Sequence, residues 1–169
     1  MPVYEVGDTV VHWNYGSGKI VAIANKGLPG EPCFYYVIEG DKQTLWVPVD
    51  ERGKSSVHPL TSRLEFKLLI SILRSQGEVM SNNPYQRHDQ LEERMQKASP
   101  EDQCRLIRDL TYRSHIRILS SYDMRVLNHA KSSIVDEWER ALGTPREIAK
   151  RKLEWILKEN RNRYPLSIY

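Results

Sequence analysis

The chain has 169 residues, of which 40% are hydrophobic and 28% are charged, and its formal net charge is +3. This is the composition of an ordinary globular protein with one domain or two small ones. No apolar run is long enough to span a bilayer, and the first residues lack the apolar core of a signal peptide. We therefore expect a cytoplasmic protein that does not bind membranes.

The charge is distributed unevenly along the chain. Residues 1–60 carry five Lys/Arg against seven Asp/Glu, whereas residues 61–169 carry twenty against fifteen. An acidic N-terminal part and a basic C-terminal part are suited to different partners. The basic surplus does not by itself establish nucleic-acid binding, because solvated helices often carry as much.

The first sixty residues have the pattern of a small β-domain. Gly7-Asp8 precedes a first apolar run, and Gly16-Ser17-Gly18 separates it from a second, which predicts a hairpin. Further residues of strand composition follow, and the predicted strands together cover residues 9–12, 20–23, 33–39, 43–49 and 57–58. Pro48 places the end of its strand at a sheet edge or a bulge. Four or five short strands predict an SH3-like or Tudor-like barrel over residues 1–60.

From Thr61 the apolar period changes from two to about 3.6, which indicates helices. In the first helix we expect one apolar face that is widened by neighbouring positions. That face consists of Leu64, Leu68 and Ile72, widened by Phe66, Leu69, Ile70 and Leu73. Asn83-Pro84 then predicts the start of a second helix, which runs to about residue 97.

Three more helices complete a predicted bundle of about five over residues 61–169, which gives an α+β fold. Ser99-Pro100 starts the third helix, with Arg105, Arg108 and Arg113 on its polar side. Ser120 or Ser121 caps the fourth, which Gly143 ends. Its inner stripe is predicted to be Met124, Leu127, Ala130, Ile134, Trp138 and Ala141. The last helix is expected to start with a capping box over residues 144–147, with Pro145 at its first position, and to end near Asn160, before a fraying tail.

Two separate motifs stand out along the chain. The first is the opening hairpin, residues 6–23 (VGDTVVHWNYGSGKIVAI), together with Val47-Pro48-Val49. The second lies in the helices and includes Ile107-Arg108-Asp109-Leu110, Arg113, Arg117, Leu119-Ser120, Asp123, Arg125, Leu127, Ala130-Lys131, Val135 and Glu137. Together they resemble the CarD/CdnL family of bacterial transcription factors, over residues 3–142 in order. A barrel of this kind also forms the RNA-polymerase-interacting domain of the transcription-repair coupling factor.

This resemblance implies a function and a set of partners. The barrel is expected to bind the β subunit of RNA polymerase by aligning a strand with it. The helical domain is expected to contact promoter DNA, weakly and without sequence specificity, at the upstream edge of the melted region. There a Trp wedge and basic side chains stabilise the open complex. The alternative is an adaptor of the same fold whose helical domain binds a second protein.

The resemblance also selects candidate site residues. Polymerase-binding positions fall at Lys26 and at Trp46, where the family has an Arg. The wedge Trp is replaced by Tyr85, which offers less apolar area. Arg87, Arg117 and Arg125 are the candidate contacts to the DNA backbone.

Each candidate also has a structural interpretation. Trp46 alternates with Leu45 and Val47, which predicts an exposed side chain, although packing into the barrel core is the alternative. Tyr85 fits a DNA wedge and packing against the preceding loop equally well. Most basic residues of the helices fit a solvated face with ion pairs to nearby acids, and Arg108-Asp109 fits an ion pair within the domain.

No pattern indicates catalysis. The five histidines lack metal-ligand spacing, and neither a nucleophile motif nor a nucleotide-binding motif occurs. We expect no enzyme activity, no cofactor and no metal. Cys33 and Cys104 are expected to be reduced thiols. The protein is expected to be a monomer.

Overall fold

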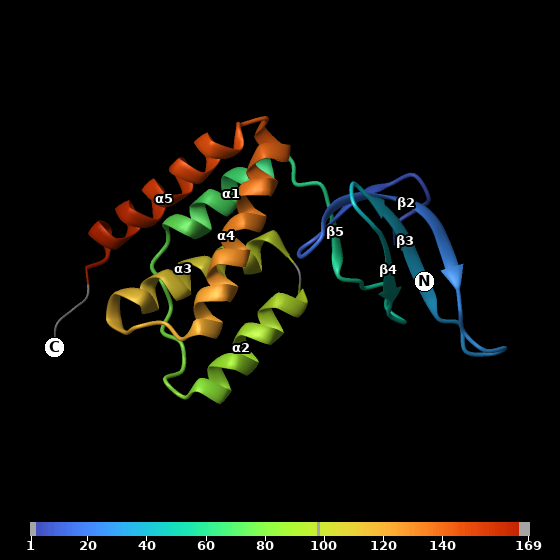
Figure 1. Cartoon of the computed structure of the whole chain (residues 1–169), viewed down its shortest axis with the longest axis horizontal. Coiled ribbons are helices and arrows are strands. Elements are labelled where there is room, and N and C mark those ends of the chain that lie inside the picture. Colours follow the sequence, from blue (N-terminus) through green and yellow to red (C-terminus); the bar gives the residue numbers. More distant parts are fainter. Residues whose placement is uncertain (1–2, 98, 166–169) are drawn as a thin grey trace. The chain divides into compact units, whose positions relative to one another are not determined.

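The computed structural model describes residues 3–97 and 99–165, and the chain forms two compact units, residues 1–60 and 61–169. Figure 1 shows the strands of the first unit and the helices of the second. The predicted α+β fold class is confirmed. No helix of the described residues is long and apolar enough to cross a membrane.

The first unit is a five-stranded antiparallel sheet. Its strands are β1 (Thr9–His12), β2 (Gly16–Asn25), β3 (Phe34–Gly40), β4 (Thr44–Val49) and β5 (Val57–Pro59). The order is β4-β3-β2-β1-β5, so consecutive strands form a meander and the last strand returns to pair with the first. Strands β4 and β5 are therefore the two edges.

The core of this unit is small and apolar. It consists of Val10, Ile20, Tyr36, Ile38, Val47, Val49 and Val57. The buried Tyr36 hydroxyl accepts hydrogen bonds from the backbone N–H groups of Val3 (2.8 Å) and Tyr4 (3.0 Å). These bonds satisfy a polar group that burial would otherwise leave without a partner, and they attach the start of the chain to the sheet.

The Gly-x-Gly of the hairpin has a steric basis. Gly16 has a φ of 79°, a left-handed conformation that side chains rarely adopt. A Cβ on Gly18 would lie 2.6 Å from Cγ2 of Ile38 and 2.8 Å from the carbonyl oxygen of Glu39. The motif therefore allows β2 to pair closely with β3.

The second unit contains five helices. They are α1 (Arg63–Arg74), α2 (Pro84–Lys97), α3 (Pro100–Ile116), α4 (Ser121–Leu142) and α5 (Arg146–Arg163). The N-caps of α1, α3 and α4 are Ser62, Ser99 and Ser120, each accepting a hydrogen bond from the backbone N–H of the third helical residue. Gly143 ends α4 in the left-handed conformation, with a φ of 63°.

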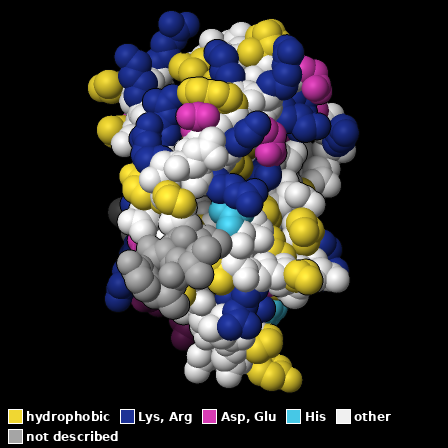
Figure 2. All heavy atoms as spheres, turned by 90° about the vertical axis from the view of Figure 1, so that its left-hand side faces the viewer, with side chains coloured by type: hydrophobic (Ala, Val, Ile, Leu, Met, Phe, Trp, Pro, Cys, Tyr) yellow, Lys and Arg dark blue, Asp and Glu magenta, His cyan; other side chains and the backbone are white. Residues whose placement is uncertain are grey.

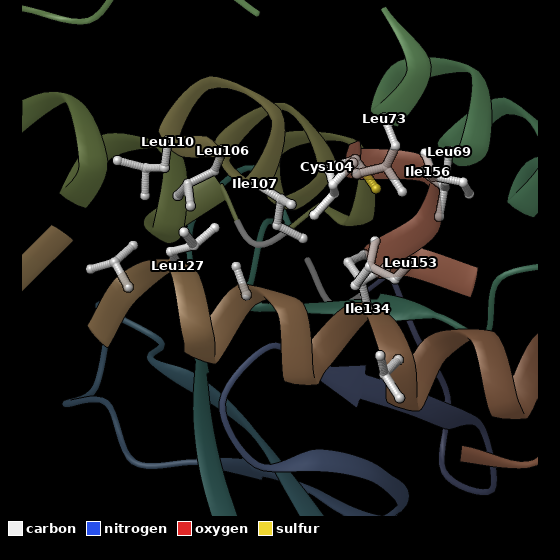
Figure 3. Close-up of a cluster of buried hydrophobic side chains, with 14 of the residues drawn as sticks. Leu69, Leu73, Cys104, Leu106, Ile107, Leu110, Leu127, Ile134, Leu153 and Ile156 are labelled. Carbon is white, nitrogen blue, oxygen red and sulfur yellow. The ribbon is translucent and has the colours of Figure 1, made fainter. Parts of the chain in front are cut away.

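Helices α1, α3, α4 and α5 pack around one hydrophobic core, which Figure 3 shows. Cys104, Leu106, Ile107 and Leu110 of α3 lie at its centre. Around them pack side chains from the other three helices, namely Leu69, Leu73, Leu127, Ile134, Leu153 and Ile156. Both cysteines are free thiols, as predicted.

The structure corrects the predicted buried faces of two helices, α1 and α4. The buried face of α1 is Phe66, Leu69 and Leu73, whereas Leu64 and Leu68 are 72% and 62% exposed. Apolar residues cover more than half of α1, so their spacing does not decide which face packs. Met124 is 45% exposed because it lies in the first turn of α4, at the end of the bundle.

The start of α5 also differs from the prediction. Pro145 is the N-cap, without a side-chain hydrogen bond, so the expected capping box does not form. The helix also continues past Asn160 to Arg163. The Asn160 side chain explains the extension, because its Nδ2 donates to the carbonyl oxygens of Leu73 and Ser75, both at 2.7 Å, and holds this turn against α1.

Candidate functional site

The two residues predicted to bind polymerase lie together on the outer surface of the sheet. Trp46 is 48% exposed, as its alternation with the buried Val47 predicts. Nζ of Lys26 lies 3.7 Å from the centre of the Trp46 ring, which is a cation–π contact. The ring of Tyr35 lies 6.4 Å from that of Trp46, at an interplanar angle of 62°. We call Lys26, Tyr35, Trp46 and Pro48 the Trp46 face.

The Trp46 face lies on an edge strand. Within the described sheet, β4 pairs only with β3, in a register that places Tyr35 opposite Pro48 and Val37 opposite Trp46. The other side of β4 carries backbone groups that a further strand can pair with. An edge strand with an exposed Trp is suited to binding an extended segment of a partner, because backbone bonds align it and the ring anchors it.

A second surface lies at one end of the helical unit. It is formed by the first turn of α2, the end of α3 and the first turns of α4, which Figure 1 shows near one another at the lower left of the bundle. We call Tyr85, Arg117, Ile118 and Arg125 the Tyr85 end. Tyr85 is 84% exposed and Ile118 is 98% exposed, so two large apolar side chains project into solvent. Arg117 and Arg125 are exposed as well.

Arg87 does not belong to this surface. Its side chain is buried, and its Nε donates to both carboxylate oxygens of Asp123, at 3.0 and 3.2 Å. Its Nη1 donates to the carbonyl oxygens of Ser81 (2.9 Å) and Asn82 (3.4 Å). The guanidinium therefore ties the first turn of α2 to the first turn of α4. These bonds do not fit the contact to the DNA backbone predicted for Arg87.

The burial of Arg87 follows from helix geometry. Residues two positions apart on a helix point about 200° apart, because each residue turns the chain by about 100°. With Tyr85 in solvent, Arg87 faces the bundle. The sequence pattern could not show this, because Tyr85 and Arg87 are both compatible with a surface position.

Arg113 adds a further buried guanidinium close to Arg87. Its Nη1 donates to Oδ1 of Asn82 at 3.2 Å, whereas its buried Nε has no hydrogen-bond partner in the described structure. The prediction that Arg108 and Arg113 lie on the polar side of α3 is therefore wrong, because both side chains are buried. Burial lowers its pKa, and the positive charges of Arg87 and Arg117 lower it further.

The buried guanidinium groups of Arg87 and Arg113 thus lie close to the carboxylate of Asp123, and Arg117 of the Tyr85 end lies near Arg113. Burial by itself would raise the pKa of Asp123, but hydrogen bonds from Arg87 and Ser120 outweigh it, and the pKa is lower than usual. Asp123 consequently remains ionised and still leaves an excess of positive charge. An anion at this end would relieve the repulsion among the arginines.

Arg125 lies beside an aromatic pair formed by the partly buried Tyr122 and the exposed His88. Its guanidinium carbon is 6.0 Å from the centre of the Tyr122 ring, and that ring is 4.4 Å from the ring of His88. The Tyr122 hydroxyl donates to Glu92. Burial and this hydrogen bond raise the pKa of Tyr122, so the phenol remains neutral. Arg125 therefore lies at the surface beside the uncharged Tyr122 ring.

Other charges of the helical unit have structural roles. The predicted ion pair between Arg108 and Asp109 is confirmed, with Nε of Arg108 2.7 Å from the carboxylate. The fully buried Asp109 also accepts from Nη1 of Arg94 (2.6 Å) and from the backbone N–H of Glu78 (2.9 Å). This cluster joins α2, α3 and the loop between α1 and α2. Among the described residues, His, Cys, Asp and Glu form no group suited to a metal ion.

Comparison with known proteins agrees with this arrangement. Residues 4–60 match the family described as the CarD-like/TRCF RID domain, which is an RNA-polymerase-interacting domain. Residues 68–154 match the family described as CarD, C-terminal domain. A protein of Bacillus subtilis (strain 168) named "Putative transcription factor YdeB" is 25% identical over 140 residues, which cover 81% of this chain and 91% of that protein.

The two matches follow each other in the same order as the two structural units. The first covers the sheet that carries the Trp46 face, and the second covers the helices that form the Tyr85 end. Together they include more than four-fifths of the chain. With both domains in place, the chain belongs to the CarD family, whose members are transcription factors of the kind that interacts with RNA polymerase.

Proposed function

We propose that this protein stabilises the promoter open complex by binding the β subunit of RNA polymerase and the upstream edge of the melted DNA. The Trp46 face aligns β4 with a strand of the β subunit. The Tyr85 end contacts DNA without reading its sequence. The observation that carries the DNA contact is the pair of exposed apolar side chains, Tyr85 and Ile118, beside an excess of arginine.

These features match what contact with a partly opened duplex requires. An apolar side chain can hold a base step open from the minor groove, and nearby cations can hold the phosphates on either side. Tyr85 and Ile118 supply the apolar surface, while Arg117 and Arg125 are exposed cations. A DNA contact made only after melting favours the open state over the closed one.

The proposed polymerase contact differs in chemistry from a simple charge pair. Lys26 lies on the Trp46 ring, so its charge and the indole form one combined surface. Such a surface can pack against an apolar side chain of the partner and also attract a carboxylate near it. We expect Trp46→Ala to weaken binding of the full-length protein to polymerase more than Lys26→Ala does.

The test is the lifetime of open complexes after a competitor is added, at several salt concentrations. At saturating protein, we expect Tyr85→Ala to shorten the lifetime by about tenfold, which corresponds to about 1.4 kcal/mol. The matched control is Val79→Ala, since Val79 is 80% exposed but lies in the loop before α2. An unchanged lifetime with Tyr85→Ala would contradict the DNA contact.

The adaptor alternative makes a different prediction for the arginines. If the Tyr85 end binds a second protein, Arg117→Gln with Arg125→Gln should leave the salt dependence of open-complex lifetime unchanged. If it binds DNA, the dependence should become shallower, because fewer phosphate counterions are displaced. The DNA contact is favoured because the Tyr85 end combines two exposed apolar side chains, Tyr85 and Ile118, with exposed arginines.

A further inference from the structure

The net positive charge of the helical unit is concentrated in one helix. Helix α5 carries seven Lys/Arg and three Glu, whereas the rest of residues 61–169 carries thirteen Lys/Arg and twelve Asp/Glu. The Tyr85 end therefore belongs to a part of the unit that is almost neutral. A large share of any attraction to a polyanion must come from α5.

The outer side of α5 combines these cations with an exposed indole. Trp155 is 55% exposed, and Arg151, Lys152 and Lys158 lie four residues before it, three before it and three after it. Residues at these spacings are neighbours on a helix surface. We call these four residues the α5 cationic face. The opposite side of α5 is buried in the core and consists of Ala149, Leu153, Ile156 and Leu157.

The charges of the α5 cationic face are not neutralised within the unit. Among the described residues, Arg151, Lys152 and Lys158 have no ion pair, and all three are exposed. By contrast, Glu154 pairs with Lys131 of α4 at 3.0 Å, and Arg146 pairs with Asp136. The exposed Glu159 follows Lys158 in the sequence, so the three cations and this acid together carry a charge of +2. Figure 2 views the molecule from the left of Figure 1 and shows Lys and Arg side chains in its upper part, with hydrophobic side chains and a few Asp and Glu side chains among them.

We propose that the α5 cationic face binds the phosphate backbone of duplex DNA, independently of sequence, as a second contact beside the Tyr85 end. This rests on the proposed function, because the polymerase contact places the protein on promoter DNA. The face extends over residues 151–158, about 11 Å of helix, which matches about three base pairs of duplex. Trp155 packs against sugars between the phosphates that the cations contact.

The last turns of α5 lie beside the end of α3 that precedes the Tyr85 end. Arg161 of α5 and His115 of α3 line the same surface depression. Burial and the charge of Arg161 lower the pKa of His115, which agrees with their proximity. His115 lies two residues before Arg117. One continuous duplex can therefore extend from the Tyr85 end along α5. Trp155 and Lys158 lie beyond residue 154, where the match to the C-terminal family ends.

The test measures binding of the full-length protein to a random-sequence 30-base-pair duplex by fluorescence anisotropy, over a range of salt concentrations. The test variant combines Arg151→Gln, Lys152→Gln and Lys158→Gln. The control combines Lys97→Gln, Arg105→Gln and Arg140→Gln, which removes the same charge from residues that each have a local carboxylate partner. Circular dichroism checks that both variants remain folded.

We expect the α5 variant to reduce the salt slope of binding by about 0.9 for each phosphate that it no longer neutralises, so by about 2 to 3 in all. The control should change the slope by less than about 1. Equal changes in both variants would mean that net charge alone matters and would overturn the proposal. An unchanged slope in the α5 variant would overturn it as well.

Trp155 allows a second, independent test. Trp155→Ala should weaken duplex binding several-fold, and Trp155→Phe should retain most of it. If the wild type instead prefers a single strand of equal length and Trp155→Ala removes this preference, the face stacks bases and the duplex proposal is wrong.

Two controls separate this proposal from the proposed function. Tyr85→Ala should leave binding of intact duplex nearly unchanged and shorten open-complex lifetime. The α5 variant should reduce both the affinity for intact duplex and the open-complex lifetime. If Tyr85→Ala did not shorten open-complex lifetime, the proposed function would be contradicted. If the α5 variant did not weaken duplex binding, the second contact would be contradicted.

Discussion

Arg87 and Asp123 form an ion pair that is almost completely buried, with exposed fractions of 6% and 3% for the two side chains. Burying either charge alone would be strongly unfavourable, because neither could keep its hydration. Further hydrogen bonds compensate for this burial. The carbonyl oxygens of Ser81 and Asn82 in the α1–α2 loop accept from Arg87, and the backbone N–H of Ser120 donates to the Asp123 carboxylate. The pair is therefore part of the framework that supports the Tyr85 end.

Removal of one partner should destabilise the protein. We expect Arg87→Ala to reduce the free energy of unfolding by about 3 to 5 kcal/mol, because it leaves the Asp123 carboxylate buried and unpaired. Urea unfolding followed by circular dichroism measures the reduction. Arg117→Ala is the control and should change stability by less than about 0.5 kcal/mol, since Arg117 is exposed. Similar reductions for the two variants would contradict the structural role of Arg87.

The same pair should make stability depend on acid pH. The pKa of Asp123 is lower in the folded protein than its ordinary value of 3.8, so the folded state favours the carboxylate. Its contribution to stability is complete above about pH 5 and is lost as the pH falls through 3.8 toward the folded pKa. We expect Asp123→Asn to be less stable than the wild type at neutral pH, with the difference shrinking below about pH 4. Thermal melts at a series of pH values test this.

At the scale of the elements, α4 is bounded by two well-defined caps. Ser120 and Asp123 form a capping box at its start, and Gly143 ends it in the left-handed conformation. These caps also fix where α5 begins, because the chain turns within three residues from Gly143 to Arg146. The position of the α5 cationic face thus depends on a backbone conformation that glycine adopts easily.

Gly143 can be tested directly. A Cβ at this position would meet nothing within 4 Å, so the effect of a substitution comes from the backbone conformation alone. We expect Gly143→Ala to lower stability by about 1 kcal/mol and Gly143→Asn to lower it less, since Asn tolerates the left-handed region better. Differential scanning calorimetry of both variants gives the comparison. A larger decrease with Asn than with Ala would contradict this reason.

At the scale of the whole molecule, the two units carry the two proposed contacts on one chain. In the proposed function, the Trp46 face acts as a tether, and the Tyr85 end stabilises melted DNA. A tether raises the local concentration of the helical unit at the promoter without changing how well that unit fits DNA. Substitutions in the two surfaces should therefore have different effects on open-complex stabilisation.

This difference gives a quantitative prediction. Trp46→Ala should raise the protein concentration needed for half-maximal stabilisation of open complexes, with the same maximal lifetime at saturation. Tyr85→Ala should lower the maximal lifetime and leave the half-maximal concentration nearly unchanged. Titration of each variant against polymerase and promoter measures both quantities. If both variants changed only the maximal open-complex lifetime, the division into tether and DNA contact would be wrong.

Much of the fold could be predicted from sequence because its signals are local. The glycines of the hairpin, the alternation of apolar and polar residues in the strands and the serine N-caps are each signals from neighbouring residues. The strands and helices of the structure lie within a few residues of their predicted bounds. Which apolar face of α1 packs could not be predicted, because it depends on contacts with α3 and α5.

The candidate site was harder to predict for the same reason. The exposure of Trp46 follows from strand alternation, and the structure agrees. The burial of Arg87 and Arg113 depends on the carboxylate of Asp123 and the amide of Asn82, which are distant in sequence. Ile118 was missed because a single Ile in a short interhelical turn carries no periodic signal. Its exposure of 98% is evident only in the structure.

The ion pair between Arg87 and Asp123 has an evolutionary consequence. A lineage that loses the arginine first inherits a buried carboxylate without a counterion, and one that loses the aspartate first inherits a buried guanidinium. Either intermediate is selected against through poor folding, whatever happens at the DNA. The two positions should therefore covary among close relatives, changing together to an apolar pair or not at all, while neighbouring Tyr85 varies freely with the demands of its partner.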